Sequence, residues 1–205
     1  MESVPLLALA AYAAGSIPSA YWIGKVFHGK DLRKLGSSNL GATNALRVLG
    51  WRAAVPVVLV DVFKGFAPAW WFPLLDGHAG AWPTVLYGGT AIVGHVFSLW
   101  VRFRGGKGVA TAAGALLAIS PMAVAVGLLA WLVALIALRT VSVASMVAAL
   151  AVGLAGLVIP GADRAVQLFL GSIAVFVVWA HRSNIRRLIA GTEPRIGGRR
   201  GEGDG

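Results

Sequence analysis

Long apolar stretches, separated by short polar clusters, dominate this chain. Uncharged stretches cover residues 3–24, 79–101, 108–138, 140–162 and 165–180, and residues 53–75 are equally apolar apart from Asp61 and Lys64. A helix needs about 20 apolar residues to cross the roughly 30 Å of hydrocarbon in a bilayer. The pattern therefore predicts an all-α integral membrane protein.

The stretch 108–138 is too long for one crossing, because a single helix of that length would extend about 46 Å. A break near Ser120 and Pro121 divides it into two helices, and proline is well tolerated at the start of a helix. The chain then has seven transmembrane helices. The first of the pair, residues 108–120, is short, and whether it crosses the whole bilayer stays open.

The basic residues favour the same count. With seven helices, segments 25–52, 102–107, 139 and 181–205 share one side and hold 6, 3, 1 and 6 of the 18 Lys and Arg residues. One undivided helix would leave 10 on one side and 7 on the other. Short cytoplasmic loops are enriched in Lys and Arg. We therefore expect the N-terminus outside and the C-terminus in the cytoplasm.

Composition narrows the class of protein further. The chain has 205 residues, of which 58% are hydrophobic and 13% charged, with a formal net charge of +10 and no cysteine. Disordered chains are poor in apolar residues, so disorder is excluded. The missing cysteine excludes disulfides, a cysteine zinc site and a thiol acyl-enzyme. We expect no nucleic-acid partner, because the basic residues of a soluble nucleic-acid-binding protein would have to cover a water-exposed surface. We also expect no metal and no cofactor.

Three polar clusters lie on the predicted cytoplasmic side, at residues 31–47, 94–111 and 181–187. The first combines glycines, hydroxyls and amides with Arg47. Glycine-rich turns expose N–H groups that bind anions, and arginine grips phosphate with two hydrogen bonds. The alternative is an ordinary helix start capped by Ser38 or Asn39, which would explain only part of the cluster.

The second cluster contains Gly94-His95 and the string Arg104-Gly-Gly-Lys107-Gly108 before a helix. Helix N-terminal N–H groups, the helix dipole and a lysine would face one anion there, although the Walker A spacing is absent. In the third cluster His181 and Asn184 share a helix face. We interpret Arg182 and Arg186 as an ordinary basic flank of the last membrane helix.

Asp61 and Lys64 form an i, i+3 pair inside a predicted span. Charges within hydrocarbon are costly, and they are usually paired, inward-facing and functional. A structural ion pair and a functional role are equally compatible with this pattern.

Six motifs, in order, resemble the bacterial acyl-phosphate-dependent glycerol-3-phosphate acyltransferases, the PlsY family. They are Gly15-Ser-Ile-Pro18, residues 36–44 (Gly-Ser-Ser-Asn-Leu-Gly-Ala-Thr-Asn), residues 61–65 (Asp-Val-Phe-Lys-Gly), Gly94-His95, residues 104–111 (Arg-Gly-Gly-Lys-Gly-Val-Ala-Thr) and residues 181–187 (His-Arg-Ser-Asn-Ile-Arg-Arg). The resemblance covers roughly residues 15–191. Ser38 departs from it, since the family usually has glycine there, and a positive φ would strain this serine.

The resemblance implies a seven-helix enzyme of the bacterial inner membrane whose active site faces the cytoplasm. It implies transfer of a fatty acyl group from acyl phosphate to the 1-hydroxyl of glycerol 3-phosphate. The products would be lysophosphatidic acid and phosphate, in the first step of phospholipid synthesis. The partners would be these two substrates and the lipid bilayer, with a functional link to the enzyme that makes acyl phosphate. Residues 1–191 would form one transmembrane catalytic domain, followed by a flexible, basic, Gly-rich tail at 192–205.

Acyl phosphate is already activated, so the enzyme needs mainly positioning and charge stabilisation. We expect catalytic roles for Ser37, Lys107, His181 and Asn184. Either His181 or a substrate phosphate would accept the proton, and which cluster binds which phosphate is open. The expected substrate-binding residues are Gly36, Ser38, Asn39, Gly41, Thr43, Asn44, Arg47, His95, Arg104, Gly105, Gly106, Gly108 and Thr111.

Two functions of other classes compete with this one. A transporter of phosphorylated metabolites would place its site at the bilayer midplane between inverted repeats, and no repeat is evident in the sequence. A non-catalytic scaffold that binds anionic lipid would tolerate changes at Ser37 and Asn39.

Overall fold

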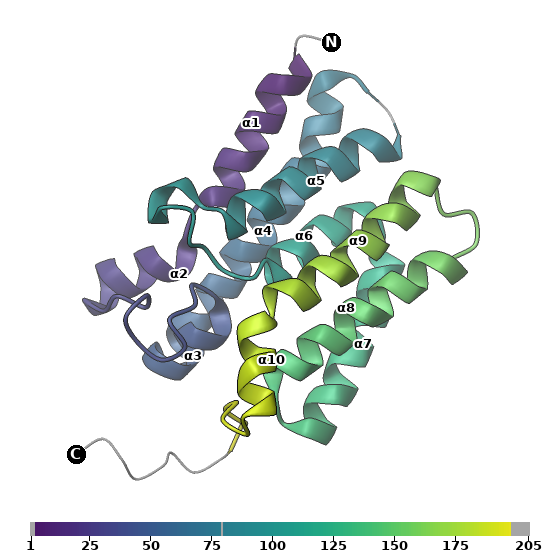
Figure 1. Cartoon of the computed structure of the whole chain (residues 1–205). Coiled ribbons are helices and arrows are strands. Elements are labelled where there is room, and N and C mark those ends of the chain that lie inside the picture. The colour runs from purple at the N-terminus through teal and green to yellow at the C-terminus, as the bar shows by residue number, and fades with distance from the viewer. Residues whose placement is uncertain (1–2, 79, 198–205) are drawn as a thin grey trace, which may run out of the picture.

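The computed structural model describes residues 3–78 and 80–197, and every regular element within these ranges is a helix (Figure 1). The first half contains α1 (Ser3–Ser16), α2 (Ser19–Trp22), the π-helix η1 (Ile23–Phe27), α3 (Ala42–Leu49), α4 (Trp51–Asp76) and α5 (Ala81–Val96). The second half contains the 3-10 helix η2 (Leu99–Val101), α6 (Val109–Ile119), α7 (Pro121–Leu138), α8 (Val141–Val158), α9 (Arg164–Ala180) and α10 (Arg182–Ile189).

The helices confirm an all-α membrane architecture. Five helical segments of the described chain are long and apolar enough to cross a bilayer, and the pair α9 and α10, bent by 52°, makes a sixth if it is one span. The predicted break at Ser120 and Pro121 is confirmed, because α6 ends at Ile119 and α7 begins at Pro121. At 11 residues, α6 is apolar but shorter than the helices that could cross a bilayer.

The first apolar stretch is interrupted. Helix α1 ends at Ser16, and α2 begins at Ser19 after Pro18. Proline has no N–H to continue the helical hydrogen-bond ladder, and its ring disfavours a helical conformation in the preceding residue. At this break the carbonyl of Ile17 accepts the N–H of Ser19 at 3.1 Å and the ammonium of Lys64 at 2.6 Å.

Close helix contacts depend on glycine. Gly15 and Gly94 bring α1 and α5 together, and Gly65 and Gly114 do the same for α4 and α6, since a Cβ at any of the four would overlap backbone atoms of the neighbouring helix. Small residues allow helices in membranes to approach closely enough for extensive van der Waals contact. The N-terminus of α6 is thereby fixed against the long helix α4.

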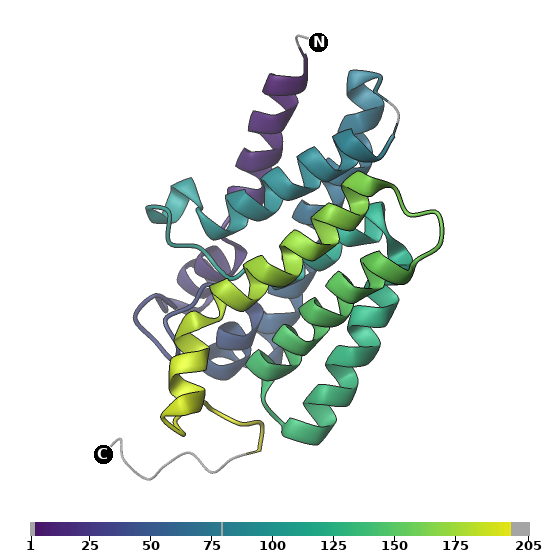
Figure 2. The same cartoon turned by 45° about the vertical axis from the view of Figure 1, so that its right-hand side comes forward.

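Helices α3 and α10 lie at one end of the molecule, and α1 begins at the other (Figures 1 and 2). The chain continues past α10 along this end: the N–H of Ile196 donates to the carbonyl of Arg139 at the turn between α7 and α8, at 2.7 Å. The first residues of the predicted tail, 192–197, therefore contact the bundle, whereas residues 198–205 lie outside the described part of the chain.

Candidate active site

A cleft of about 500 Å³ opens where the three polar clusters meet. Its lining combines basic and polar side chains with apolar ones. The residues that line it are Ser37, Ser38, Asn39, Val96, Phe97, Phe103, Arg104, Gly105, Gly106, Lys107, Trp179, Ala180, Arg182, Ser183, Arg186 and Arg187.

The first part of the lining, residues 37–39, belongs to a loop whose conformation is fixed by Asn44. The buried Asn44 amide donates to the carbonyls of Leu32 at 3.2 Å and Leu35 at 3.1 Å, and its Oδ1 accepts from the N–H of Ser37 at 2.9 Å. The loop turns at Gly36 and Ser38, both with positive φ. Ser37 is thus fixed by its backbone, and its side chain lies at the cleft.

The second part of the lining comes from the Gly-Gly-Lys-Gly loop, residues 105–108. The N–H of Gly105 donates to the carbonyl of Val96 at 2.9 Å, and the N–H of Gly106 donates to that of His95 at 3.2 Å. Gly108 then begins α6 with φ of 79°, and no side chain caps this helix. Uncapped N–H groups and the helix dipole make such a terminus suitable for an anion.

Lys107 is the cation at the centre of the site. Its ammonium donates to Oδ1 of Asn184, which joins the second cluster to the third. Burial lowers the pKa of Lys107 to about 8, the positive charges of Arg187 and Arg47 lower it as well, and Glu193 opposes them. A phosphate in the cleft would supply the negative charge that the lysine lacks.

Glu193 holds residues of the third cluster in position. It accepts hydrogen bonds from Asn184 Nδ2 at 2.6 Å, Ser142 Oγ at 2.7 Å and Arg187 Nε at 2.7 Å. Burial opposes its ionisation, but these three donors hold the pKa of the Glu193 carboxyl below its ordinary value. Asn184 therefore has a fixed orientation, with its amide nitrogen on Glu193 and its oxygen on Lys107.

His181 lies at the junction of α9 and α10. It is buried, and its Nδ1 is 2.7 Å from the carbonyl of Val177. A carbonyl only accepts, so this contact places the proton of the neutral imidazole on Nδ1. Nε2 is then the ring nitrogen that can accept a proton, but His181 is not part of the cleft lining. Burial and the charge of Lys107 lower the pKa of His181 to about 4, so the imidazole is a weak base.

Seven of the predicted site residues line the cleft. These are Ser37, Ser38, Asn39, Arg104, Gly105, Gly106 and Lys107. Asn184 joins them through Lys107. Gly36, Gly41 and Gly108 shape the loops: Gly36 and Gly108 have positive φ, and Gly41 precedes α3. Arg47 and Thr43 are exposed on α3, outside the lining, although Arg47 is near enough for its charge to act on Lys107.

Three residues predicted to bind substrate have other surroundings. The side-chain amide of Asn44 makes its hydrogen bonds within its own loop. Thr111 is fully buried one turn into α6, against Gly65 of α4. His95 is buried beneath the glycine loop, with Nδ1 3.6 Å from Oδ1 of Asp61.

Sequence reasoning also missed residues. Arg182 and Arg186, interpreted as an ordinary flank, line the cleft, and Phe97, Phe103 and Trp179 form its apolar side. Glu193 and Ser142 were not expected at all. Exposed aromatic residues beside a cationic cluster are a usable signal, whereas nothing in the local sequence marks Glu193, which stands alone in a Gly- and Arg-rich segment.

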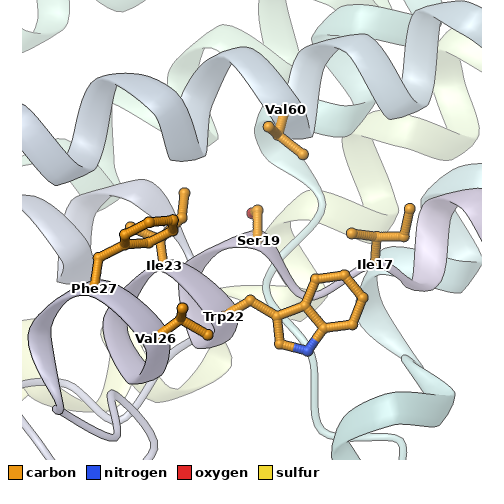
Figure 3. A pocket seen from close by; sticks show the side chains of 7 residues that line it. All are labelled: Ile17, Ser19, Trp22, Ile23, Val26, Phe27 and Val60. Atoms are coloured by element: carbon orange, nitrogen blue, oxygen red, sulfur yellow. The ribbon is translucent and has the colours of Figure 1, made fainter.

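A second pocket, of about 450 Å³, lies between the α2–η1 segment and α4 (Figure 3). Ile17, Trp22, Ile23, Val26, Phe27 and Val60 make it apolar, and Ser19 is the polar residue in its lining. It contains no residue of the three clusters.

Known proteins of one family resemble this chain over nearly its whole length. A family model described as glycerol-3-phosphate acyltransferase matches residues 5–191. The glycerol-3-phosphate acyltransferase of Listeria monocytogenes serovar 1/2a is 45% identical over 195 residues, covering 93% of this chain and 96% of the relative. That of Salinibacter ruber is 41% identical over 215 residues, covering 96% and 93%.

Two crystal structures of PlsY, an integral membrane glycerol 3-phosphate acyltransferase, have the same fold. The glycerol 3-phosphate form superposes with a TM-score of 0.87 at 37% identity, covering 95% of this chain and 96% of that one. The lysophosphatidic acid form gives 0.84 at 35% identity, covering 94% and 95%. This chain therefore belongs to the glycerol-3-phosphate acyltransferase family, as a PlsY-type integral membrane member.

Proposed function

We propose that this enzyme transfers a fatty acyl group from acyl phosphate to the 1-hydroxyl of glycerol 3-phosphate. The observation that carries the proposal is the cleft itself, whose lining combines Lys107 and Arg187 with the apolar side chains of Phe97 and Phe103. Lys107 lies just before the N-terminus of α6. Two phosphates and one acyl chain need this combination. The PlsY structures with glycerol 3-phosphate and with lysophosphatidic acid support the acceptor and the product.

The reaction needs little covalent help from the protein. The hydroxyl oxygen attacks the acyl carbonyl, a new ester bond forms, and the bond from the acyl carbon to the phosphate oxygen breaks. Inorganic phosphate leaves with the electron pair of that bond. Catalysis then consists of aligning the two substrates and stabilising negative charge.

Lys107 and the N–H groups that begin α6 hold one phosphate and stabilise the charge that develops on it. Arg187 and the other two arginines of α10 bind the second phosphate. The positive charge of Arg47 on α3 also attracts this phosphate. Ser37 orients the reacting groups by hydrogen bonding. The hydroxyl proton passes to Nε2 of His181 or to a substrate phosphate, which is also a competent acceptor at neutral pH.

We also propose seven crossings, with the three clusters and the C-terminus in the cytoplasm of a bacterial cell and α6 as the short crossing. Cations at residues 25–52, 102–107, 139 and 181–187 support this orientation, because they would all lie at the cytoplasmic face. The active site then receives glycerol 3-phosphate from the cytoplasm. An enzyme that makes acyl phosphate must supply the donor on the same side.

The test is acyl transfer by the purified protein in detergent, with palmitoyl phosphate and labelled glycerol 3-phosphate. We expect lysophosphatidic acid from the wild type and at least a hundredfold lower kcat from folded Lys107→Ala. Arg102→Ala is the matched control, because Arg102 is an exposed cation of the same loop outside the cleft lining. Near-normal turnover by Lys107→Ala would contradict the assignment, and transport that needs sealed vesicles would favour the rival function.

A further inference from the structure

A network of buried polar side chains lies under the glycine loop and takes no part in the mechanism above. Asp61 and Lys64 of α4 are 1% and 4% exposed, and His95 at the end of α5 is 7% exposed. None of the three lines the cleft. Burying charges in a membrane bundle is costly, and a buried ion pair is weak evidence for a gain in stability. A different reason for the network is therefore needed.

Asp61 and Lys64 are tied to the interruption between α1 and α2. Lys64 Nζ lies 2.8 Å from Oδ1 of Asp61 and donates to the carbonyl of Ile17 at 2.6 Å. The hydroxyl of Ser19 donates to the same carboxylate oxygen at 2.6 Å. Figure 3 shows the Ser19 side chain directed from α2 toward α4, beside Val60. The carboxylate is thus fixed from two helices.

His95 connects this carboxylate to the loop. Its Nδ1 is 3.6 Å from Oδ1 of Asp61 and has no hydrogen-bond partner, although it is buried. That separation is too long for a hydrogen bond, but a small shift of the ring would close it. A buried N–H without a partner is costly, so the carboxylate favours this ring orientation.

The other edge of the ring supports Gly106. A Cβ at Gly106 would overlap Nε2 of His95, so the imidazole lies directly against this backbone. The carbonyl of His95 also accepts the N–H of Gly106, and that of Val96 accepts the N–H of Gly105. The residue after Gly106 is Lys107. The imidazole thus contacts the backbone directly before the lysine.

We propose that Asp61, Lys64 and His95 are positioning residues, in which the ion pair orients the His95 ring and the ring fixes the Gly105–Gly106 turn so that Lys107 faces the cleft. The inference rests on the proposed function, because it assigns the network to the loop that binds phosphate. It replaces a direct contact between His95 and substrate by a contact through the loop.

The double variant Asp61→Asn/Lys64→Met tests this without leaving one buried charge uncompensated. We expect this variant to fold and to lose about tenfold to a hundredfold in kcat/KM for glycerol 3-phosphate, as when groups that orient active-site residues are lost. We also expect a shift in the alkaline limb of its pH profile, which is the fall of kcat/KM at high pH. That limb reports the loss of the proton from Lys107, which is faced by Arg187, Arg47, Glu193 and Asn184. A loosened loop exposes the lysine to water, so the limb moves to higher pH.

His95→Asn is the second variant, because it keeps an N–H for Asp61 but removes the ring atoms beneath Gly106. We expect the same loss and the same shift of the limb. Thr90→Val is the matched control: Thr90 is on the same helix α5 and donates only to Leu86, at 2.6 Å. We expect it to leave both the limb and kcat/KM unchanged.

The outcomes separate the two proposals. Normal kcat/KM and an unmoved limb in folded variants, beside an active wild type, would overturn the positioning role alone. Failure of both variants to fold would also overturn it, because the network would then serve the fold rather than the loop. No acyl transfer by the wild type would overturn the proposed function and this inference with it.

Discussion

At the scale of single residues, the chemistry of the site depends on how Lys107 is surrounded. Its ammonium donates to Asn184, and Asn184 is held by Glu193 on its other side. Lys107 is therefore already oriented and partly desolvated before the proposed phosphate binds. Preorganised charge of this kind stabilises a transition state without reorganisation during the reaction.

The pH dependence of kcat/KM should reveal this lysine. Because the pKa of Lys107 is lowered to about 8 by burial, the free enzyme loses the cation as the pH rises through 8. We expect kcat/KM to fall about tenfold for each further pH unit. Lys107→Arg keeps its charge at these pH values, so its residual activity should lack this limb. The same limb in the arginine variant would show that another group titrates.

Ser38 has a positive φ of 57°. The sequence predicts that a positive φ would strain this serine. A left-handed conformation costs a residue with a Cβ about 1–2 kcal/mol, and the greater freedom of glycine in the unfolded state returns part of that. Ser38→Gly should therefore raise the thermal midpoint slightly and leave kcat within about twofold. A lower midpoint would mean that the serine hydroxyl stabilises the loop.

Glu193 should matter for both fold and activity, because its side chain is 6% exposed and binds Asn184, Ser142 and Arg187. Glu193→Gln loses the charge-assisted bonds, so we expect a lower thermal midpoint and about a tenfold loss in kcat/KM. Asp163→Asn is the control, because asparagine also caps helices and Asp163 caps only α9. Unchanged kinetics in Glu193→Gln would remove Glu193 from the site.

At the scale of elements, α6 follows the Gly-Gly-Lys-Gly loop and is held in place by α4. Gly114 of α6 lies against the backbone of Val62, so even a methyl group forces the helices apart. We expect Gly114→Ala to lower the thermal midpoint by several degrees and to impair acyl transfer. Gly171→Ala on α9 has open space around the added carbon and should be neutral or stabilising. Equal behaviour of the two would contradict this packing argument.

The elements also show why prediction succeeded where it did. Apolar length and proline placed α4, α7, α8 and α9 within a few residues and located the break before Pro121. Helix α1 was predicted to continue to residue 24, because the pattern is apolar on both sides of Pro18. The role of the interruption is visible only in the tertiary structure, where the carbonyl of Ile17 accepts a hydrogen bond from Lys64.

At the scale of the whole molecule, the site forms from segments far apart in the sequence. Composition and local motif indicated that 36–44, 104–108 and 181–187 bind anions, and the cleft contains all three. Local sequence could not separate residues that line the cleft from buried ones such as His95 and Thr111, because both kinds are polar and belong to the same glycine-containing motifs. Glu193 was missed because its partners are on α8 and α10.

The central claim is that acyl phosphate is the donor and glycerol 3-phosphate the acceptor in this cleft. The most direct measurement follows lysophosphatidic acid and inorganic phosphate together, with purified protein, palmitoyl phosphate and labelled glycerol 3-phosphate. We predict one phosphate released for each lysophosphatidic acid formed, and loss of both products in Lys107→Ala. No product with palmitoyl phosphate, or product only with a thioester donor, would contradict the account.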